Sequence, residues 1–181
     1  RVCRQMNVEL QGEVAYCRVN HMRKLLPSLC VLTILLGSAA WAAELAVINP
    51  GFEQPIDRRA DWRALQHAGA RAYDMGVDDK VSAEGKRSFR IKRYAEQVYA
   101  AVNQRIPAQG SGGRTVRLSA MLRTEEVGPK GWMLMVNYLG ESDRIIAQAR
   151  SEPKTGTTPW RRVTLEKQIP TGTEMLVVGA M

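Results

Sequence analysis

Few side chains in this sequence have the types and spacing that catalysis requires. His67 is the only histidine after the first 42 residues, and no Ser or Cys near it lies in the pattern of a nucleophile elbow. The carboxylate pairs Asp78–Asp79 and Glu125–Glu126 are adjacent in sequence, so on strands their side chains would point to opposite faces. A glycosidase needs two carboxylates that face each other across a cleft, and zinc needs Cys or further His ligands. The sequence therefore predicts that the protein is not an enzyme.

The elements that would position these side chains are predicted to be strands. Apolar and polar residues alternate with a period of two, which is typical of half-buried strands. In 88–94, for example, Phe89 and Ile91 share one face while Arg90 and Lys92 share the other. The other alternating runs are 115–124, 131–140 and 160–170, and a last, short apolar strand is predicted at 174–181.

Gly- and Pro-rich segments separate these runs and predict turns. They lie at 107–113, 127–131, 140–143 and 151–159. The only candidate helix is 57–73, where Gly69 and the lack of caps favour a strand–loop–strand instead. Short strands separated by such turns predict an all-β fold, an antiparallel β-sandwich.

The N-terminal part has the three features of an export signal. Met22 is followed by Arg23 and Lys24, then by a mostly apolar stretch, then by Ala40-Trp41-Ala42. We therefore predict that 1–21 is a non-native upstream segment, that 22–42 is a signal peptide, and that 43–181 is the domain. The apolar stretch is too short to span a bilayer, since about 20 residues are needed. The mature protein is expected to be secreted or periplasmic, with no stable membrane anchor after cleavage.

The positions of the cysteines and the net charge bear on whether the domain has disulfides and whether it binds nucleic acid. Cys3, Cys17 and Cys30 all precede the predicted cleavage site, so the mature domain must fold without a disulfide. The 139 residues of 43–181 carry 21 basic and 16 acidic side chains, a net charge of +5. The basic residues are dispersed rather than gathered into the patch or stripe that nucleic-acid binding requires. We expect no nucleic-acid partner.

Several short motifs carry a resemblance when they are taken in order. They are "NPGFE" (49–53), Trp62, Asp78, "EGKRSFRI" (84–91), "VNQRIP" (102–107), "VRLSAMLRTEEV" (116–127) and "GTTPWRRVTLEKQIPTGTEMLVVGAM" (156–181). This order resembles the cellulase-type carbohydrate-binding modules of the galactose-binding-like jelly-roll superfamily, over nearly all of 45–181. The resemblance implies a jelly-roll sandwich, with "NPGFE" at the start of its first strand and Phe52 plugging its end.

The resemblance also implies a glycan partner. Sugar binding needs flat aromatic rings against pyranose faces, together with amides or charges for the hydroxyl groups. Trp132 and Tyr138 share strand parity with apolar residues, so one or both belong to the core in the alternative interpretation. Arg123 is a solvated surface side chain in the alternative interpretation. The two Phe, four Trp and five Tyr of the chain are few for a protein that binds glycans strongly. The candidate ligand-binding residues are Tyr94, Tyr99, Arg123, Trp132, Asn137 and Tyr138.

In such modules the Glu of the first motif often helps to hold a structural calcium. Glu53 matches that position, and Asp78 or Asp79 is a possible second ligand. The alternative is that Glu53 is a rim residue bonded to backbone, because calcium takes six to eight oxygens and no late carboxylate is evident. The chain ends before the closing strand that these modules carry, so we expect a C-terminal strand to be missing.

The sequence therefore favours an exported, non-catalytic, carbohydrate-binding-like module with weak or undetermined glycan affinity. One alternative is a structural or protein-interaction sandwich without a sugar ligand, and another is the accessory domain of a secreted hydrolase. Trp132→Ala is predicted to harm folding more than binding.

Overall fold

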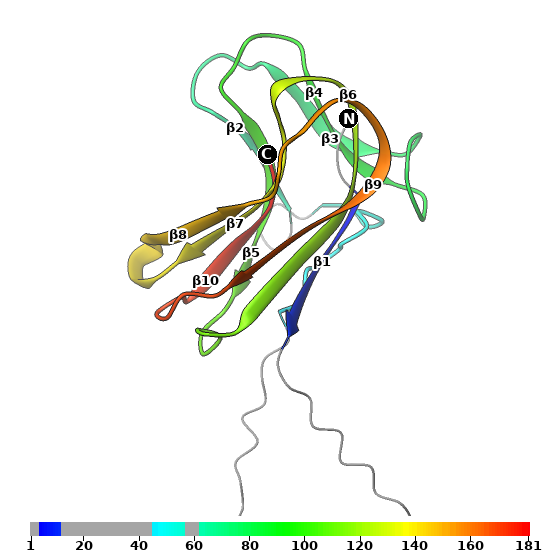
Figure 1. Cartoon of the computed structure of the whole chain (residues 1–181). Helices are drawn as coiled ribbons and strands as arrows, with labels where there is room; N and C mark the ends of the chain where they lie inside the picture. The colour runs from blue at the N-terminus through cyan, green and yellow to red at the C-terminus, as the bar shows by residue number, and fades with distance from the viewer. Residues whose placement is uncertain (1–3, 12–44, 57–61) are drawn as a thin grey trace, which may run out of the picture.

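Ten strands, all paired antiparallel, account for most of the described chain. The computed structural model describes residues 4–11, 45–56 and 62–181 (Figure 1). The strands are β1 (Arg4–Gln11), β2 (Arg63–Gln66), β3 (Tyr73–Asp78), β4 (Ser88–Arg93), β5 (Ala100–Pro107), β6 (Thr115–Trp132), β7 (Leu134–Leu139), β8 (Ile145–Arg150), β9 (Lys154–Gln168) and β10 (Met175–Ala180). A short 3-10 turn, η1 (Glu141–Asp143), is the only helical segment in these ranges.

The strands form a sandwich, as predicted. One layer is a five-stranded sheet in the order β2-β5-β10-β7-β8. The other holds the three-stranded sheet β1-β6-β9, and the β3-β4 hairpin forms a separate two-stranded sheet that contacts β1 through β4 and β2 through β3. Figure 1 shows β8, β7, β10 and β5 spread on one side and β9, β6 and β1 on the other.

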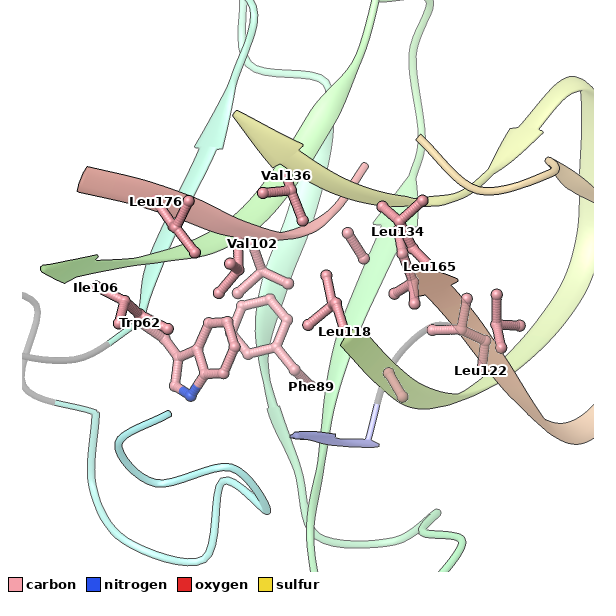
Figure 2. Packing of buried hydrophobic residues seen from close by; sticks show 14 of the residues in the cluster. Trp62, Phe89, Val102, Ile106, Leu118, Leu122, Leu134, Val136, Leu165 and Leu176 are labelled. Atoms are coloured by element: carbon pink, nitrogen blue, oxygen red, sulfur yellow. The ribbon is translucent and has the colours of Figure 1, made fainter. Parts of the chain in front are cut away.

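The core lies between the layers and follows the predicted alternation. Every second residue of β6 is buried from Val116 to Leu122, and Phe89 and Ile91 of β4 are buried while Lys92 is exposed. Side chains from the two layers converge in Figure 2 because each strand directs alternate residues inward. Leu118 and Leu165 come from one layer, and Val102, Val136 and Leu176 from the other.

An aromatic cluster forms part of this core. The ring centroid of Phe52 lies 5.1 Å from that of Trp62 and 5.4 Å from that of Phe89. Phe52 is fully buried and Trp62 is 1% exposed, so both rings belong to the core. The indole Nε1–H of Trp62 donates to the carbonyl of Asn49 at 3.0 Å, which satisfies its one polar group.

The expectation that "NPGFE" begins a strand is wrong. Residues 49–53 form a turn, closed by a 3.1 Å hydrogen bond from the Phe52 N–H to the Asn49 carbonyl. Asn49 and Phe52 have φ of 50° and 58°, which a strand does not allow. The buried Gln104 side chain holds this segment instead, since its amide accepts from and donates to the Ile48 backbone at 2.7 and 3.0 Å.

The predicted signal peptide, 22–42, lies outside the described residues. Part of the predicted upstream segment is described: Arg4–Gln11 forms β1 and pairs with Thr115–Met121 at the edge of β6. The division of the chain into 1–21, 22–42 and 43–181 stays a prediction. Among the described residues, no helix has the length and apolar character needed to cross a membrane.

Candidate functional site

A cleft of about 690 Å³ opens at one end of the sandwich. One wall lies within 91–100, which comprises the end of β4, the connection to β5 and the first residue of β5, and the other is the segment 125–133 at the end of β6. Tyr73, Arg150 and Met181 complete the lining. Its volume lies within the range of about 300–1,000 Å³ that is typical of small-ligand sites.

The second wall belongs to an arm in which β6 and β9 run beyond the rest of the sheet. Their pairing shifts register at three places between Leu122 and Trp132, and Glu126 has a φ of 53°. Such irregularities bend paired strands, and the far ends of β6 and β9 curve over together in Figure 1. Gly131 is required here, because a Cβ on it would lie 2.5 Å from the Cβ of Pro153.

Side-chain hydrogen bonds hold the bend of the arm. The hydroxyl oxygens of Thr124 and Thr158 lie 2.8 Å apart, and Thr124 is buried. The N–H of Glu126 donates to the hydroxyl of Thr157 at 3.1 Å. The predicted turns at 127–131 and 151–159 are therefore wrong in part, because most of both segments belongs to this strand pair.

The first wall is tied to the loop before β3. The Tyr94 N–H donates to the Ala72 carbonyl at 2.9 Å, and the side-chain amide of Gln97 reaches the Ala70 carbonyl at 3.3 Å. The rings of His67 and Tyr99 meet edge to face, with centroids 5.5 Å apart. These contacts fix the backbone that presents Tyr99 to the cleft.

Three aromatic rings line the cleft. Trp132 and Tyr99 are half-buried, and Tyr73 is 6% exposed. Trp132 packs against the core as well as lining the cleft, so the prediction for Trp132→Ala stays a prediction. Half-buried rings with one open face can bind apolar faces of a ligand.

The structure thus brings together two of the six predicted ligand-binding residues, Tyr99 and Trp132. Tyr94 is 59% exposed and lies on the same connecting segment, next to the lining residue Arg93. Arg123 is outside the lining, with its guanidinium 4.0 Å from the carboxylate of Glu125.

The other two predicted residues lie away from the cleft. Asn137 is half-buried on β7, and its side-chain oxygen accepts from the amide of Gln148 on β8 at 3.1 Å. Tyr138 is 2% exposed and belongs to the core, so it is corrected from a candidate ligand contact to a packing residue. Burial raises the pKa of the Tyr138 phenol from 10.0 to about 12.

Charged residues of the cleft were not predicted from the sequence. Seven lie in the lining: Lys92, Arg93, Glu96, Glu125, Glu126, Lys130 and Arg150. Strand parity predicted opposite faces for Glu125 and Glu126, but both line the cleft because the register shift around Glu126 breaks the alternation. A Gly- and Pro-rich segment inside a strand is the signal that could have indicated such a bulge.

Glu53 has backbone partners. Its Oε1 accepts the N–H of Lys86 at 2.8 Å and that of Arg87 at 3.3 Å, while the Arg87 guanidinium donates to the Glu53 carbonyl at 3.0 Å. Among the described residues, no three His, Cys, Asp or Glu side chains gather where they could hold a metal ion. A structural calcium held by Glu53 stays a prediction.

Comparisons with known proteins support the fold class. Neither the family models nor the curated proteins contain a match to this chain. Among solved structures, the chain is similar to the enzymatically active domain of bacteriophage CBA120 tailspike protein 4, with 16% sequence identity and a TM-score of 0.53. The match covers 66% of this chain and 16% of the tailspike chain, so it indicates a shared sandwich fold within a much longer protein.

Proposed function

We propose that this chain is an exported, non-catalytic carbohydrate-binding module, with the cleft as a weak glycan site. The sandwich architecture and the order of the motifs support kinship with galactose-binding-like jelly rolls. The basic, apolar and small-residue pattern of 22–42 supports export to the periplasm or beyond.

One observation carries the glycan proposal. Tyr99 comes from the connection between β4 and β5 and Trp132 from the end of β6, yet both line the same cleft of about 690 Å³. Charged side chains accompany the two rings in that lining. Rings beside charged groups are the combination that sugars require, since each sugar presents an apolar face and a rim of hydroxyl groups.

Isothermal titration against a panel of soluble oligosaccharides tests the proposal. We expect at least one glycan to bind with a Kd of about 1 mM or tighter, which corresponds to about 4 kcal/mol. Tyr99→Ala should weaken that binding about fivefold, since an aromatic contact contributes about 1 kcal/mol. Tyr99→Phe keeps the ring and should bind like the wild type. Trp160→Ala is a control, because Trp160 is a half-buried tryptophan outside the lining.

Two results would overturn the proposal in different ways. If no glycan in the panel binds, the structural or protein-interaction sandwich is favoured. If new reducing ends appear during long incubation with a bound glycan, the protein is an enzyme rather than a binding module. The second measurement is informative because Glu96, Glu125 and Glu126 all line the cleft.

A further inference from the structure

The cleft contains cationic side chains from three parts of the fold. Lys92 and Arg93 lie at the end of β4, Lys130 lies near the end of β6, and Arg150 ends β8. All four side chains are exposed. Because the four cations lie on three separate strands, their positive charge is distributed around the cleft and is not concentrated at one place.

The pairing of these four cations decides whether they are available to a ligand. Within the described part of the chain, none of the four forms an ion pair or a side-chain hydrogen bond. Elsewhere, Arg90 pairs with Asp74 at 2.7 Å, Arg117 pairs with Glu166 at 2.8 Å, and Arg105 pairs with Asp143. The cations of the cleft are therefore available to a ligand.

The acidic side chains of the cleft do not cancel the positive charge of these four cations. The lining holds four cations against three carboxylates, and one of the three, Glu125, has Arg123 beside it. An open cleft with a modest positive excess favours a ligand whose negative charges are well separated. Guanidinium groups suit carboxylates in particular, because two parallel N–H groups can bind the two oxygens.

We propose that the preferred ligand is an acidic polysaccharide whose repeating sugars carry carboxylates, that is, a uronate-containing glycan. This inference rests on the proposed function, since it assigns the charge of the sugar to the same cleft. Tyr99 and Trp132 contact sugar faces, while Arg150 and Lys130 bind carboxylates. Nucleic acid fits less well, because it carries about one phosphate per 1.7 Å of duplex and would meet the three carboxylates of the lining.

Polygalacturonate and its fully methyl-esterified form make a matched pair of probes that differ in charge. At about 50 mM salt, we expect the acid form to bind the full chain at least tenfold more tightly than the ester. The difference should shrink at about 0.5 M salt, because screening weakens contacts between exposed charges. Single-stranded DNA and a sulfated glycan serve as other polyanions.

Variants that remove a single positive charge test which cations of the cleft bind the carboxylates. Arg150→Gln and Lys130→Gln should each weaken binding of the acid form about threefold to tenfold and leave binding of the ester unchanged. Arg161→Gln is the matched control, since Arg161 is an exposed residue of β9 outside the lining. Unchanged melting midpoints would show that the variants fold.

The outcomes separate the two proposals. Equal binding of acid and ester would overturn the uronate preference and leave the glycan module intact. Failure of every glycan to bind would overturn both. Tighter binding of single-stranded DNA or of the sulfated glycan than of polygalacturonate would also overturn the uronate preference, as would an equal loss in Arg161→Gln.

Discussion

Tyr138 shows how one residue can satisfy a sequence pattern for a different reason from the one assumed. Its aromatic ring and strand parity fit a sugar contact and a core residue equally well, and the structure places it in the core at 2% exposure. Its hydroxyl is buried and has no hydrogen-bond partner in the described structure. A buried polar group in that state costs about 1–3 kcal/mol of stability.

Replacing Tyr138 with Phe should therefore stabilise the fold. We expect Tyr138→Phe to raise the free energy of unfolding by about 1 kcal/mol at neutral pH, because it removes the unsatisfied hydroxyl and keeps the ring. Urea melts of both proteins measure the difference. A loss of stability in the variant would mean that the hydroxyl has a partner after all.

The raised pKa of the Tyr138 phenol predicts that the stability of the fold depends on pH. Burial raises its pKa from 10.0 to about 12, so between these values the unfolded chain releases a proton that the folded protein retains. The folded state then binds more protons, and the wild type should lose stability as the pH rises from 10 to 12. Tyr138→Phe should lose less over the same range. Equal slopes in the two sets of melts would contradict the raised pKa.

At the scale of the element, β10 depends on a glycine. Gly179 lies between β5 and β7, and a Cβ there would overlap the carbonyl oxygen of Val102 and lie 2.8 Å from the Cα of Asn103. Backbone atoms cannot move aside as a flexible side chain can. The close approach of β5 and β10 therefore requires glycine at this position.

Gly179→Ala should lower the free energy of unfolding by about 1–3 kcal/mol, the usual cost of overpacking. Gly76→Ala is a matched control, because Gly76 also lies on a strand and a Cβ there would meet no atom within 4 Å. Thermal melts of the two variants test the difference. Equal midpoints would show that β5 and β10 can separate without cost.

The elements that could be predicted from the sequence were those with a regular period or a short apolar run. The runs that became β4 and the first part of β6 alternate because one face meets the core. The runs that became β7 and β10 are mostly apolar because most of their residues are buried. β5 was not predicted as a separate run, since six of its eight residues, including polar Asn103 and Gln104, are buried and no two-residue pattern appears. The arm of β6 and β9 was missed because Pro and Gly resemble turn residues there.

For the whole molecule, the fold class was predictable and the cleft was not. A sandwich follows from many short alternating runs, and no single residue decides it. The cleft depends on where an irregular arm and the 91–100 segment come to face each other, which no local pattern records. This is why Tyr99 and Trp132 were predicted by type, whereas Lys92, Lys130 and Arg150 were not.

The pairing of β1 with β6 gives a prediction at this same scale. Removal of residues 1–42 would expose the β6 edge along Thr115–Met121. Amides of this segment should exchange with solvent faster in 43–181 than in the full chain, because about half of them lose a strand partner. Leu176–Val178 of β10, which is paired on both sides, is the internal control. Equal exchange at 115–121 would show that β1 does not protect this edge.

The position of β1 has a consequence for association between molecules. Residues 4–11 cover the rim of this layer with their own backbone. In a chain that lacks these residues, the same rim would offer unpaired backbone groups to an extended segment of another molecule. Strand exchange at this rim would then depend on whether residues 4–11 are present.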